Sequence, residues 1–410
     1  MARLQPFRAL RPKPSDAAGI AAVPYDVVST DEARALAGDN PLSFLRVSRP
    51  ELELPPGTDP YSAAVYQRAA WNFENLKRSS FVIEDEPSVY FYRLRMGDHH
   101  QTGMAACYAL DEYDRGLIKK HERTRRDKED DRTRHTIALG AQTGPVFLMY
   151  RASPEVDRIA ERVVTGDALF DFEAPDAVRH TLWRVGGADR DALVAAFGRI
   201  PTLYIADGHH RAASAARARA DMRERGATGT SLGDDANGST FLAVAFPHDQ
   251  VQILPYNRIV KDLDGLAPDA FLQAVGDRFQ LEAGAPAPGR RGDLAMYFNG
   301  RWSTLRPRGR PEASDAIRSL DVSVLQDRLL APVLKVTDPG TDARLDFVGG
   351  VRGTGQLEKL VDSGGAAVAF SMYPVSVADL MAVADAGAIM PPKSTWFEPK
   401  LRDGLLIHMI

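Results

Sequence analysis

Cysteine is almost absent from the sequence. Cys107 is the only one among 410 residues, so no disulfide can form within these residues. This excludes the small disulfide-stabilised folds of secreted proteins and indicates a reducing compartment. Cys107 lies in the apolar run "GMAACYAL", where a buried and inert thiol is typical. We therefore expect Cys107 to pack in a core rather than to act as a nucleophile.

Long apolar runs are also absent. The most apolar stretch, 364–390, is broken by Ser371, Pro374, Asp379 and Asp385, and no window reaches the ~18 apolar residues of a membrane span. The N-terminal segment "MARLQPFRALRPKP" contains charge but no apolar run, so we expect no signal peptide. These absences predict a cytoplasmic protein without membrane contact.

An excess of positive charge is missing as well. The net charge is −4, with 26% charged and 44% hydrophobic residues. Proteins that bind nucleic acid or anionic membranes usually carry a basic excess, so this balance argues against a nucleic-acid partner. The chain is long enough for two or three domains with cores of their own, and it has no coiled-coil heptads.

Two common nucleotide-binding motifs do not occur. The sequence has neither GxxxxGKS/T nor GxGxxG. The glycine-rich segment 349–360, "GGVRGTGQLEKL", opens a predicted helix but lacks a lysine at the required spacing, so it predicts a turn and a cap. A phosphoryl donor would therefore have to bind through side chains and a helix N-terminus.

Local patterns predict both helices and strands. A capping box at Ser29 and Glu32 predicts a helix that starts near Thr30. The segments 88–96 and 102–110 have the composition of strands. Because helices and strands are mixed along the chain, we expect an α+β, or mixed α/β, fold.

The domain organisation is predicted only coarsely. We expect an N-terminal α/β lobe at 1–150 and a second α+β lobe at 151–410 that includes a C-terminal extension. A stretch rich in glycine, serine and aspartate, 226–239, predicts a flexible surface loop.

One strand-to-helix junction concentrates polar chemistry. The segment 201–220, "PTLYIADGHHRAASAARARA", has a short strand pattern followed by an alanine-rich helix. Between them stand five residues: Asp207, Gly208, His209, His210 and Arg211. Gly208 permits a tight turn, and Asp207 can be the N-cap of the helix.

The cations at this junction stand at the unfavourable end of the helix. Positive groups near a helix N-terminus oppose the dipole, so they indicate an anion bound between them. A phosphate would satisfy both the N–H groups and the guanidinium of Arg211. The alternative is an ordinary Asp-Gly cap with solvated histidines.

The segment 119–135, "KKHERTRRDKEDDRTRH", is locally basic, with eight Lys/Arg and five acidic residues. It predicts either a solvated, ion-paired helix or a source of arginines, among them Arg132, for a polyphosphate. Glu122 within it could be a base or metal partner, or part of a cap or ion pair. Arg46 could bind a substrate carboxylate or be an ordinary surface residue, and Lys393 could reach a phosphate or be solvated.

Several motifs together resemble a known family. "VPYDVVS", "NPLSFLRVSRPE", "KKHERT…KEDDR", "YIADGHHR" and "MPPKSTWFEPK" occur in this order. The set resembles a bacterial and archaeal family, domain-of-unknown-function family 1015, over most of the chain. The chain departs from the usual Lys-x-Asp-Arg pattern: residues 128–132 read Lys-Glu-Asp-Asp-Arg, which is one residue longer.

The "DGHHR" core also resembles free-serine kinases of the ParB/sulfiredoxin-like fold. This resemblance implies such a core around the strand-turn-helix at 202–220. It implies a phosphotransferase that makes O-phosphoserine from free L-serine, with ATP, ADP or pyrophosphate as donor. Asp207 would then hold Mg²⁺ or orient the hydroxyl, while His209, His210 and Arg211 would contact the phosphoryl group.

The complete predicted site joins these residues to the other candidates. The catalytic candidates are Asp207, His209, His210 and Glu122. The candidates for binding the substrate or phosphate are Gly208, Arg211, Arg46, His121, Arg132 and Lys393. Asp207 is the metal candidate, and the expected partner is a small-molecule substrate.

Two alternatives stand beside the kinase. The first is a metal-dependent hydrolase, with nitrogen and oxygen ligands from Asp207, His209, His210, His121 and Glu122. No HExxH motif supports it. The second is a non-enzymatic, ParB-like nucleotide-binding regulator. A basic recognition helix, which such a regulator would use on DNA, is not evident in the sequence.

Overall fold

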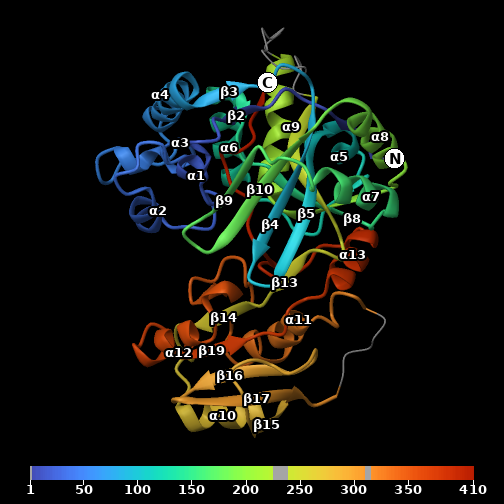
Figure 1. The fold of residues 1–410 in the computed structure, drawn as a ribbon. Helices are drawn as coiled ribbons and strands as arrows, with labels where there is room; N and C mark the ends of the chain where they lie inside the picture. Colours follow the sequence, from blue (N-terminus) through green and yellow to red (C-terminus); the bar gives the residue numbers. More distant parts are fainter. Residues whose placement is uncertain (1, 225–238, 310–314) are drawn as a thin grey trace. The chain divides into compact units, whose positions relative to one another are not determined.

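A computed structural model describes residues 2–224, 239–309 and 315–410, and the fold is mixed α/β, as expected (Figure 1). The predicted loop at 226–239 lies outside the described residues except for Ser239. The chain forms two compact units. The first comprises Met1–Lys120, Thr124–Val251 and Pro399–Ile410, and the second comprises His121–Arg123 and Gln252–Glu398.

The first unit is built on a nine-stranded sheet. Eight strands follow one path: β6 (Ile118–Lys119), β11 (Leu203–Asp207), β8 (Val146–Tyr150), β12 (Thr240–Pro247), β5 (His99–Ala109), β4 (Val89–Met96), β10 (Val178–Val185) and β9 (Phe170–Glu173). The ninth, β1 (Leu4–Gln5), pairs with β5. The strands expected at 88–96 and 102–110 are confirmed as β4 and β5. Their apolar and aromatic side chains suit a sheet that is largely buried.

Residue 150, where we expected a lobe boundary, is the last residue of β8 and lies within the first unit. β8 pairs antiparallel with β11 and parallel with β12. Both partner strands come later in the chain. β8 therefore belongs to the same sheet as residues well beyond position 150.

The helices of the first unit pack around this sheet (Figure 1). They are α1 (Ala17–Ile20), α2 (Thr30–Ala37), α3 (Leu45–Ser48), α4 (Ala63–Ser80), α5 (Leu110–Asp114), α6 (Arg126–Leu139), α7 (Pro154–Val163), α8 (Gly187–Phe197) and α9 (His209–Glu224), with a 3₁₀ turn at Pro50–Glu53. The predicted capping box is confirmed: Ser29 Oγ accepts the Glu32 N–H at 3.2 Å, and Glu32 accepts the Ser29 N–H at 2.9 Å.

The last residues of the chain return to the first unit. β21 (His408–Met409) pairs with β7 (Ala141–Gln142), and Ile407 forms a bridge with Leu10 of β2 (Leu10–Pro12), which pairs with β3 (Phe81–Ile83). Ile407 is fully buried in an apolar core with Phe44 and Phe73. The burial of this apolar segment fixes the preceding residues, 399–406, on the same unit.

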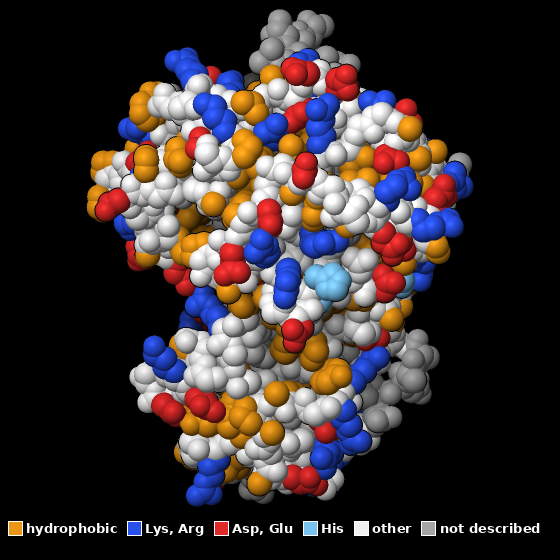
Figure 2. Space-filling view, viewed as in Figure 1, with side chains coloured by type: hydrophobic (Ala, Val, Ile, Leu, Met, Phe, Trp, Pro, Cys, Tyr) orange, Lys and Arg blue, Asp and Glu red, His pale blue; other side chains and the backbone are white. Residues whose placement is uncertain are grey.

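A second apolar core lies against the large sheet and includes Phe91, Tyr108, Phe197 and Phe241. Cys107 is buried on β5, which confirms the expectation of a buried thiol. Acidic and basic side chains alternate over the face of the first unit that Figure 2 shows, in agreement with the balanced charge of the sequence.

The second unit has an antiparallel six-stranded sheet. Its order is β15 (Phe279–Ala283), β17 (Arg301–Pro307), β16 (Leu294–Phe298), β19 (Val368–Ser371), β14 (Tyr256–Val260) and β18 (Leu345–Gly349). A separate pair joins β13 (Gln252–Leu254) to β20 (Trp396–Glu398).

Helices and short turns complete the second unit. The α-helices are α10 (Pro268–Gly276), α11 (Asp321–Leu325), α12 (Gly355–Asp362) and α13 (Val377–Asp385). A π-helical turn covers Gln326–Leu330, and the glycine-rich segment gives a 3₁₀ turn at Gly350–Arg352 before α12. In the part of the chain that the structure describes, no helix is both long and apolar enough to cross a membrane.

Candidate functional site

Strand β11 ends in the turn that the sequence singled out. Gly208 has φ +89°, a backbone conformation that favours glycine, and helix α9 begins at the next residue. The Ala212 N–H donates to the Gly208 carbonyl at 3.0 Å, so Gly208 stands at the start of the helix. A Cβ added to Gly208 would lie 2.9 Å from Arg211 Nε. Glycine is therefore needed both for the turn and for the close approach of Arg211.

Asp207 does not cap the helix as predicted, because it lies one residue too early. Its Oδ1 instead accepts the adjacent Gly208 N–H at 2.8 Å. Its Oδ2 lies 3.1 Å from Lys400 Nζ and 3.6 Å from Arg211 Nη2. Burial alone would raise the pKa of Asp207, but Lys400, Arg211 and the Gly208 N–H hold it well below its usual value. Asp207 is therefore ionised throughout the physiological pH range.

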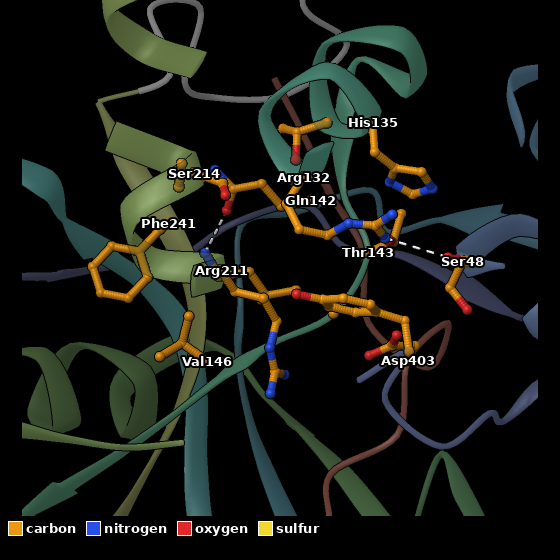
Figure 3. Close-up of a pocket in the computed structure, with 15 residues that line it drawn as sticks. Ser48, Arg132, His135, Gln142, Thr143, Val146, Arg211, Ser214, Phe241 and Asp403 are labelled. Carbon is orange, nitrogen blue, oxygen red and sulfur yellow. Dashed lines mark hydrogen bonds between the residues drawn. The ribbon is translucent and has the colours of Figure 1, made fainter. Parts of the chain in front are cut away.

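A small pocket lies next to this turn within the first unit (Figure 3). Arg132 of α6 and Arg211 of α9 both line it, together with Ser48, Gly144 and Asp403. Its cavity volume is about 40 Å³. At roughly 10–15 Å³ per water-sized group, it holds about three such groups. The pocket thus suits one small anionic group better than a whole nucleoside.

Arg132 is held rigidly at the pocket wall. Its Nε and Nη2 bind Asp131 Oδ2 at 2.8 and 2.7 Å, and its Nη1 donates to the Ser48 carbonyl at 3.3 Å. Its guanidinium lies over the ring of Tyr25, 4.2 Å from the centroid. Tyr66 fixes Asp131 in turn through a 2.9 Å hydrogen bond. This arrangement presents a preorganised, buried cation.

Arg211 is also buried, with 9% of its side chain exposed. One of its terminal nitrogens donates to the Pro145 carbonyl. Among the described residues, its buried Nε has no hydrogen-bond partner. A buried donor without a partner costs free energy, so this N–H is a natural contact for a ligand oxygen.

Asp403 supplies a carboxyl group to the same pocket. Its backbone is fixed by hydrogen bonds with Ala22, and the next N–H donates to the Thr143 carbonyl at 3.0 Å. The residue is 3% exposed, and its buried Oδ1 has no partner among the residues that the structure describes. Burial raises its pKa to about 7, because the opposing effects of Arg211 and Arg132 do not offset burial and the neighbouring Asp26.

The two histidines flank the helix start. His210 Nε2 accepts the Arg125 N–H at 3.0 Å, and the His210 carbonyl accepts from Ser214 Oγ at 2.7 Å. His209 is buried. Both lie in the first turn of α9, as predicted, and their contact with a phosphoryl group stays a prediction.

Arg46 lies outside this pocket. It donates to the carbonyls of Asn40 and Gly38 at 3.0 and 2.7 Å, and it pairs with Glu53 at 2.7 Å. It lines another hollow, beside α4. These contacts fix the guanidinium of Arg46 to the neighbouring residues Gly38, Asn40 and Glu53. They give no support to the predicted binding of a substrate carboxylate.

The other candidates belong to the second unit. The His121 carbonyl accepts the Met390 N–H at 2.9 Å, and the Lys393 carbonyl accepts from Arg258 at 3.1 Å. Glu122 follows His121 in the same short segment. The site described above is built from the first unit alone, so the roles of these three residues stay predictions.

Two residues of the site were missed in the sequence. Lys400 is the last residue of the motif "MPPKSTWFEPK", in which the sequence predicts a phosphate contact for Lys393 only. Asp403 follows three positions later in "LRDGLL". No local sequence pattern identifies either residue as part of the site. Both reach the site because residues 399–410 pack on the first unit.

The fold and site together define a mixed α/β protein with a small, buried, arginine-lined pocket. The chain belongs to the family described as "Protein of unknown function (DUF1015)", which it matches over residues 4–323. This confirms the family resemblance seen in the motifs. No curated protein matches the chain.

Solved structures are similar only at a low level. A conserved hypothetical protein from Pyrococcus furiosus is 14% identical, with 74% of this chain and 95% of that chain covered and a TM-score of 0.37. A free serine kinase in complex with AMP is 13% identical, with 73% and 92% covered and a TM-score of 0.36. SbnI from Staphylococcus aureus, with a C-terminal truncation, is 12% identical, with 74% and 87% covered and a TM-score of 0.40. At these values the ParB/sulfiredoxin-like core stays a prediction.

Proposed function

We propose that this protein is a small-molecule phosphotransferase whose phosphoryl group binds between Arg132 and Arg211. The observation that carries the proposal is that two buried guanidinium groups line one small pocket, with Arg211 Nε lacking a partner among the described residues. The acceptor we propose is the hydroxyl of free L-serine, and the donor is ATP, ADP or pyrophosphate.

The charges around the pocket favour an anion. Arg132, Arg211 and Lys400 are set against Asp131 and Asp207, and Asp403 adds a negative charge only where it is ionised. Buried cations in excess of their counter-charges are costly unless a ligand neutralises them. Guanidinium groups match phosphate oxygens in geometry as well as charge. A phosphoryl group therefore matches the pocket in size and charge, and Arg211 Nε is a donor available to it.

In the proposed reaction the serine hydroxyl oxygen forms a new bond to phosphorus. The bond from phosphorus to the donor's leaving oxygen breaks, the leaving group keeps that electron pair, and the serine hydroxyl proton is released to bulk water. Positioning and charge neutralisation supply most of the catalysis in such reactions. Asp207 is a poor general base because its pKa lies far below neutrality, so we assign it to orienting the hydroxyl.

Asp207 is also a poor fit for a resident Mg²⁺. Its two oxygens already face Lys400, Arg211 and the Gly208 N–H, so a metal would have to displace cations. We therefore place Mg²⁺ in the proposal only as a companion of the donor phosphates. His209 and His210 stand at the helix start, where they would contact the transferred group.

A product assay tests the proposal. The purified protein is incubated with L-serine, Mg²⁺ and, separately, ATP, ADP or pyrophosphate, and O-phosphoserine is measured by mass spectrometry. We expect product from one donor, and a loss of about 100-fold or more in Arg211→Lys and His210→Ala. Lysine keeps the charge of Arg211 but lacks its planar fork of donors.

Arg179→Gln is the matched control, since Arg179 is half-exposed on β10 and pairs with Asp171 away from the pocket. It should leave the product rate unchanged. No O-phosphoserine from any donor, in a folded sample, would overturn the serine kinase. Nucleotide binding without consumption would instead favour the regulator, and tightly bound zinc would favour the hydrolase.

A further inference from the structure

The carboxyl group of Asp403 is the one acidic side chain among the residues lining the pocket. It is buried, and within the described part of the chain its Oδ1 has no hydrogen-bond partner. Gly144 leaves the space for this oxygen: a Cβ there would lie 2.5 Å from Oδ1. Figure 3 shows Arg211 and Asp403 among the lining residues, both below Arg132 in this view.

The charged neighbours of Asp403 come from several elements. They are Arg211 of α9, Arg132 of α6, the adjacent Arg402 and the exposed Asp26 before α2. Arg402 is itself paired with Asp176. Arg211 and Arg132, which an anionic ligand would share, thus favour the charged form of Asp403, whereas Asp26 disfavours it.

Two other titratable groups line the pocket but stay neutral. Burial and the nearby Arg132 lower the pKa of His135 to about 3, and its Nε2 contacts the Val47 carbonyl at 2.9 Å. Burial raises the pKa of the Tyr25 hydroxyl above its usual value. Near neutral pH, Asp403 is therefore the pocket-lining group whose charge changes.

We infer that the pocket takes up one proton on Asp403 together with its ligand, a tetrahedral dianion such as a phosphoryl group. An ionised Asp403 would repel a dianion in this buried setting, whereas the protonated carboxyl can donate a hydrogen bond to a ligand oxygen. The inference rests on the phosphoryl-binding site of the proposed function and adds that Asp403 binds a proton when the ligand binds.

The inference predicts a definite pH dependence. Asp403 is mostly protonated at pH 6 and mostly ionised at pH 8, because burial raises its pKa to about 7. Linkage then requires the affinity to fall as the pH rises. Between pH 6 and pH 8 we expect a fall of about tenfold, the change in the protonated fraction.

Sulfate is the probe for this test, because it remains a dianion across the whole range and only the protein titrates. Its binding is measured by isothermal titration calorimetry at pH 6 and 8, at constant ionic strength, in two buffers with different ionisation enthalpies. The wild-type protein should bind about tenfold more weakly at pH 8. At pH 8 it should take up close to one proton per sulfate, and at pH 6, where Asp403 is already mostly protonated, only about 0.1. Asp403→Asn, which is neutral and carries a donor, should bind equally at both pH values without proton uptake.

Asp171→Asn is the matched control, because Asp171 is an exposed acid paired with Arg179 outside the pocket. It should keep the wild-type pH dependence. A tenfold change that persists in Asp403→Asn would assign the proton to another group, such as a histidine of α9, and overturn the inference. Absence of proton uptake at pH 8, or of sulfate binding at either pH, would overturn it as well.

The same experiments separate this inference from the proposed function. O-phosphoserine formation together with pH-independent sulfate binding would overturn only the proton linkage. A proton-linked sulfate site without product from any donor would overturn only the serine kinase.

Discussion

Lys400 Nζ lies 3.1 Å from Asp207 Oδ2, although the two residues are 193 positions apart in the chain. The contact joins the end of the chain to the strand-turn-helix that carries Arg211. The side chains of Lys400 and Asp207 are only 11% and 26% exposed. The terminal segment is therefore part of the site and not an accessory to it.

Removing Lys400 should destabilise the first unit. In Lys400→Met, Asp207 keeps its buried charge but loses its nearest cation, and we expect a loss of roughly 1–3 kcal/mol in the free energy of unfolding. Part of this loss should be recovered in Lys400→Met/Asp207→Asn, where the carboxylate that lost Lys400 is replaced by a neutral amide. Urea denaturation of the two single variants and the double variant measures the coupling.

The pH dependence of this effect has a definite sign. The folded state holds the pKa of Asp207 below its usual value, so the stabilisation is present above pH ~4 and is lost as the pH falls. The cost of Lys400→Met should therefore shrink in acid. Lys77→Met is the control, since Lys77 pairs with the half-exposed Glu74 and should cost at most about 0.5 kcal/mol. If Lys400→Met and Lys77→Met lowered the free energy of unfolding equally, the ion pair between Lys400 and Asp207 would contribute no more than an exposed one.

A side chain at Gly208 should disturb Arg211. Gly208→Ala combines a strained backbone at φ +89° with a Cβ placed 2.9 Å from Arg211 Nε. We expect a loss of roughly 1–3 kcal/mol in unfolding free energy, together with weaker sulfate binding. Calorimetry and urea denaturation measure the two effects on the same sample.

Gly57→Ala separates the two causes. Gly57 has a similar φ of +84°, but no atom lies within 4 Å of its added Cβ. This variant should share the backbone strain and leave sulfate binding unchanged. If Gly208→Ala also bound sulfate normally, Arg211 would not be the anion ligand that we propose.

The parts of the site that could be predicted are those with local signals. The strand, glycine turn and helix start at 203–211 are encoded by neighbouring residues, as is the capping box at Ser29. Arg132 could be indicated only as one of two alternatives, because its charge pattern suits a surface helix equally well. Its burial depends on Tyr25, which contacts it from a distant part of the chain.

The remainder of the site depends on long-range packing. Asp403 reaches the pocket because its backbone bonds to Ala22 and because the next residue bonds to Thr143. The central place of β8 likewise depends on β11 and β12, which follow it by dozens of residues. The periodicity and composition of the sequence near these residues do not identify partners so far away in the chain. These contacts could therefore be found only in the folded structure.

Asp403 should also make the stability of the protein pH-dependent. Its folded-state pKa of about 7 exceeds the ordinary value, so the folded state binds the proton more tightly than the unfolded state does. The stability that this gives is fully present below pH ~4 and is lost as the pH rises to about 7. In Asp403→Asn the side chain cannot ionise, so this loss of stability with rising pH should be absent.

We therefore expect Asp403→Asn to be more stable than the wild type at pH 8, by at most about 4 kcal/mol at ~1.4 kcal/mol per pKa unit. The difference should shrink towards zero near pH 4. Urea denaturation in buffers without phosphate or sulfate measures it at each pH. Asp171→Asn should show the opposite sign at pH 8, because the hydrogen bond from Arg179 lowers the pKa of Asp171. An Asp403→Asn variant that is less stable than the wild type at pH 8 would show that its carboxylate is stabilised by the two arginines. The pocket would then lack the excess of positive charge that the anion site requires.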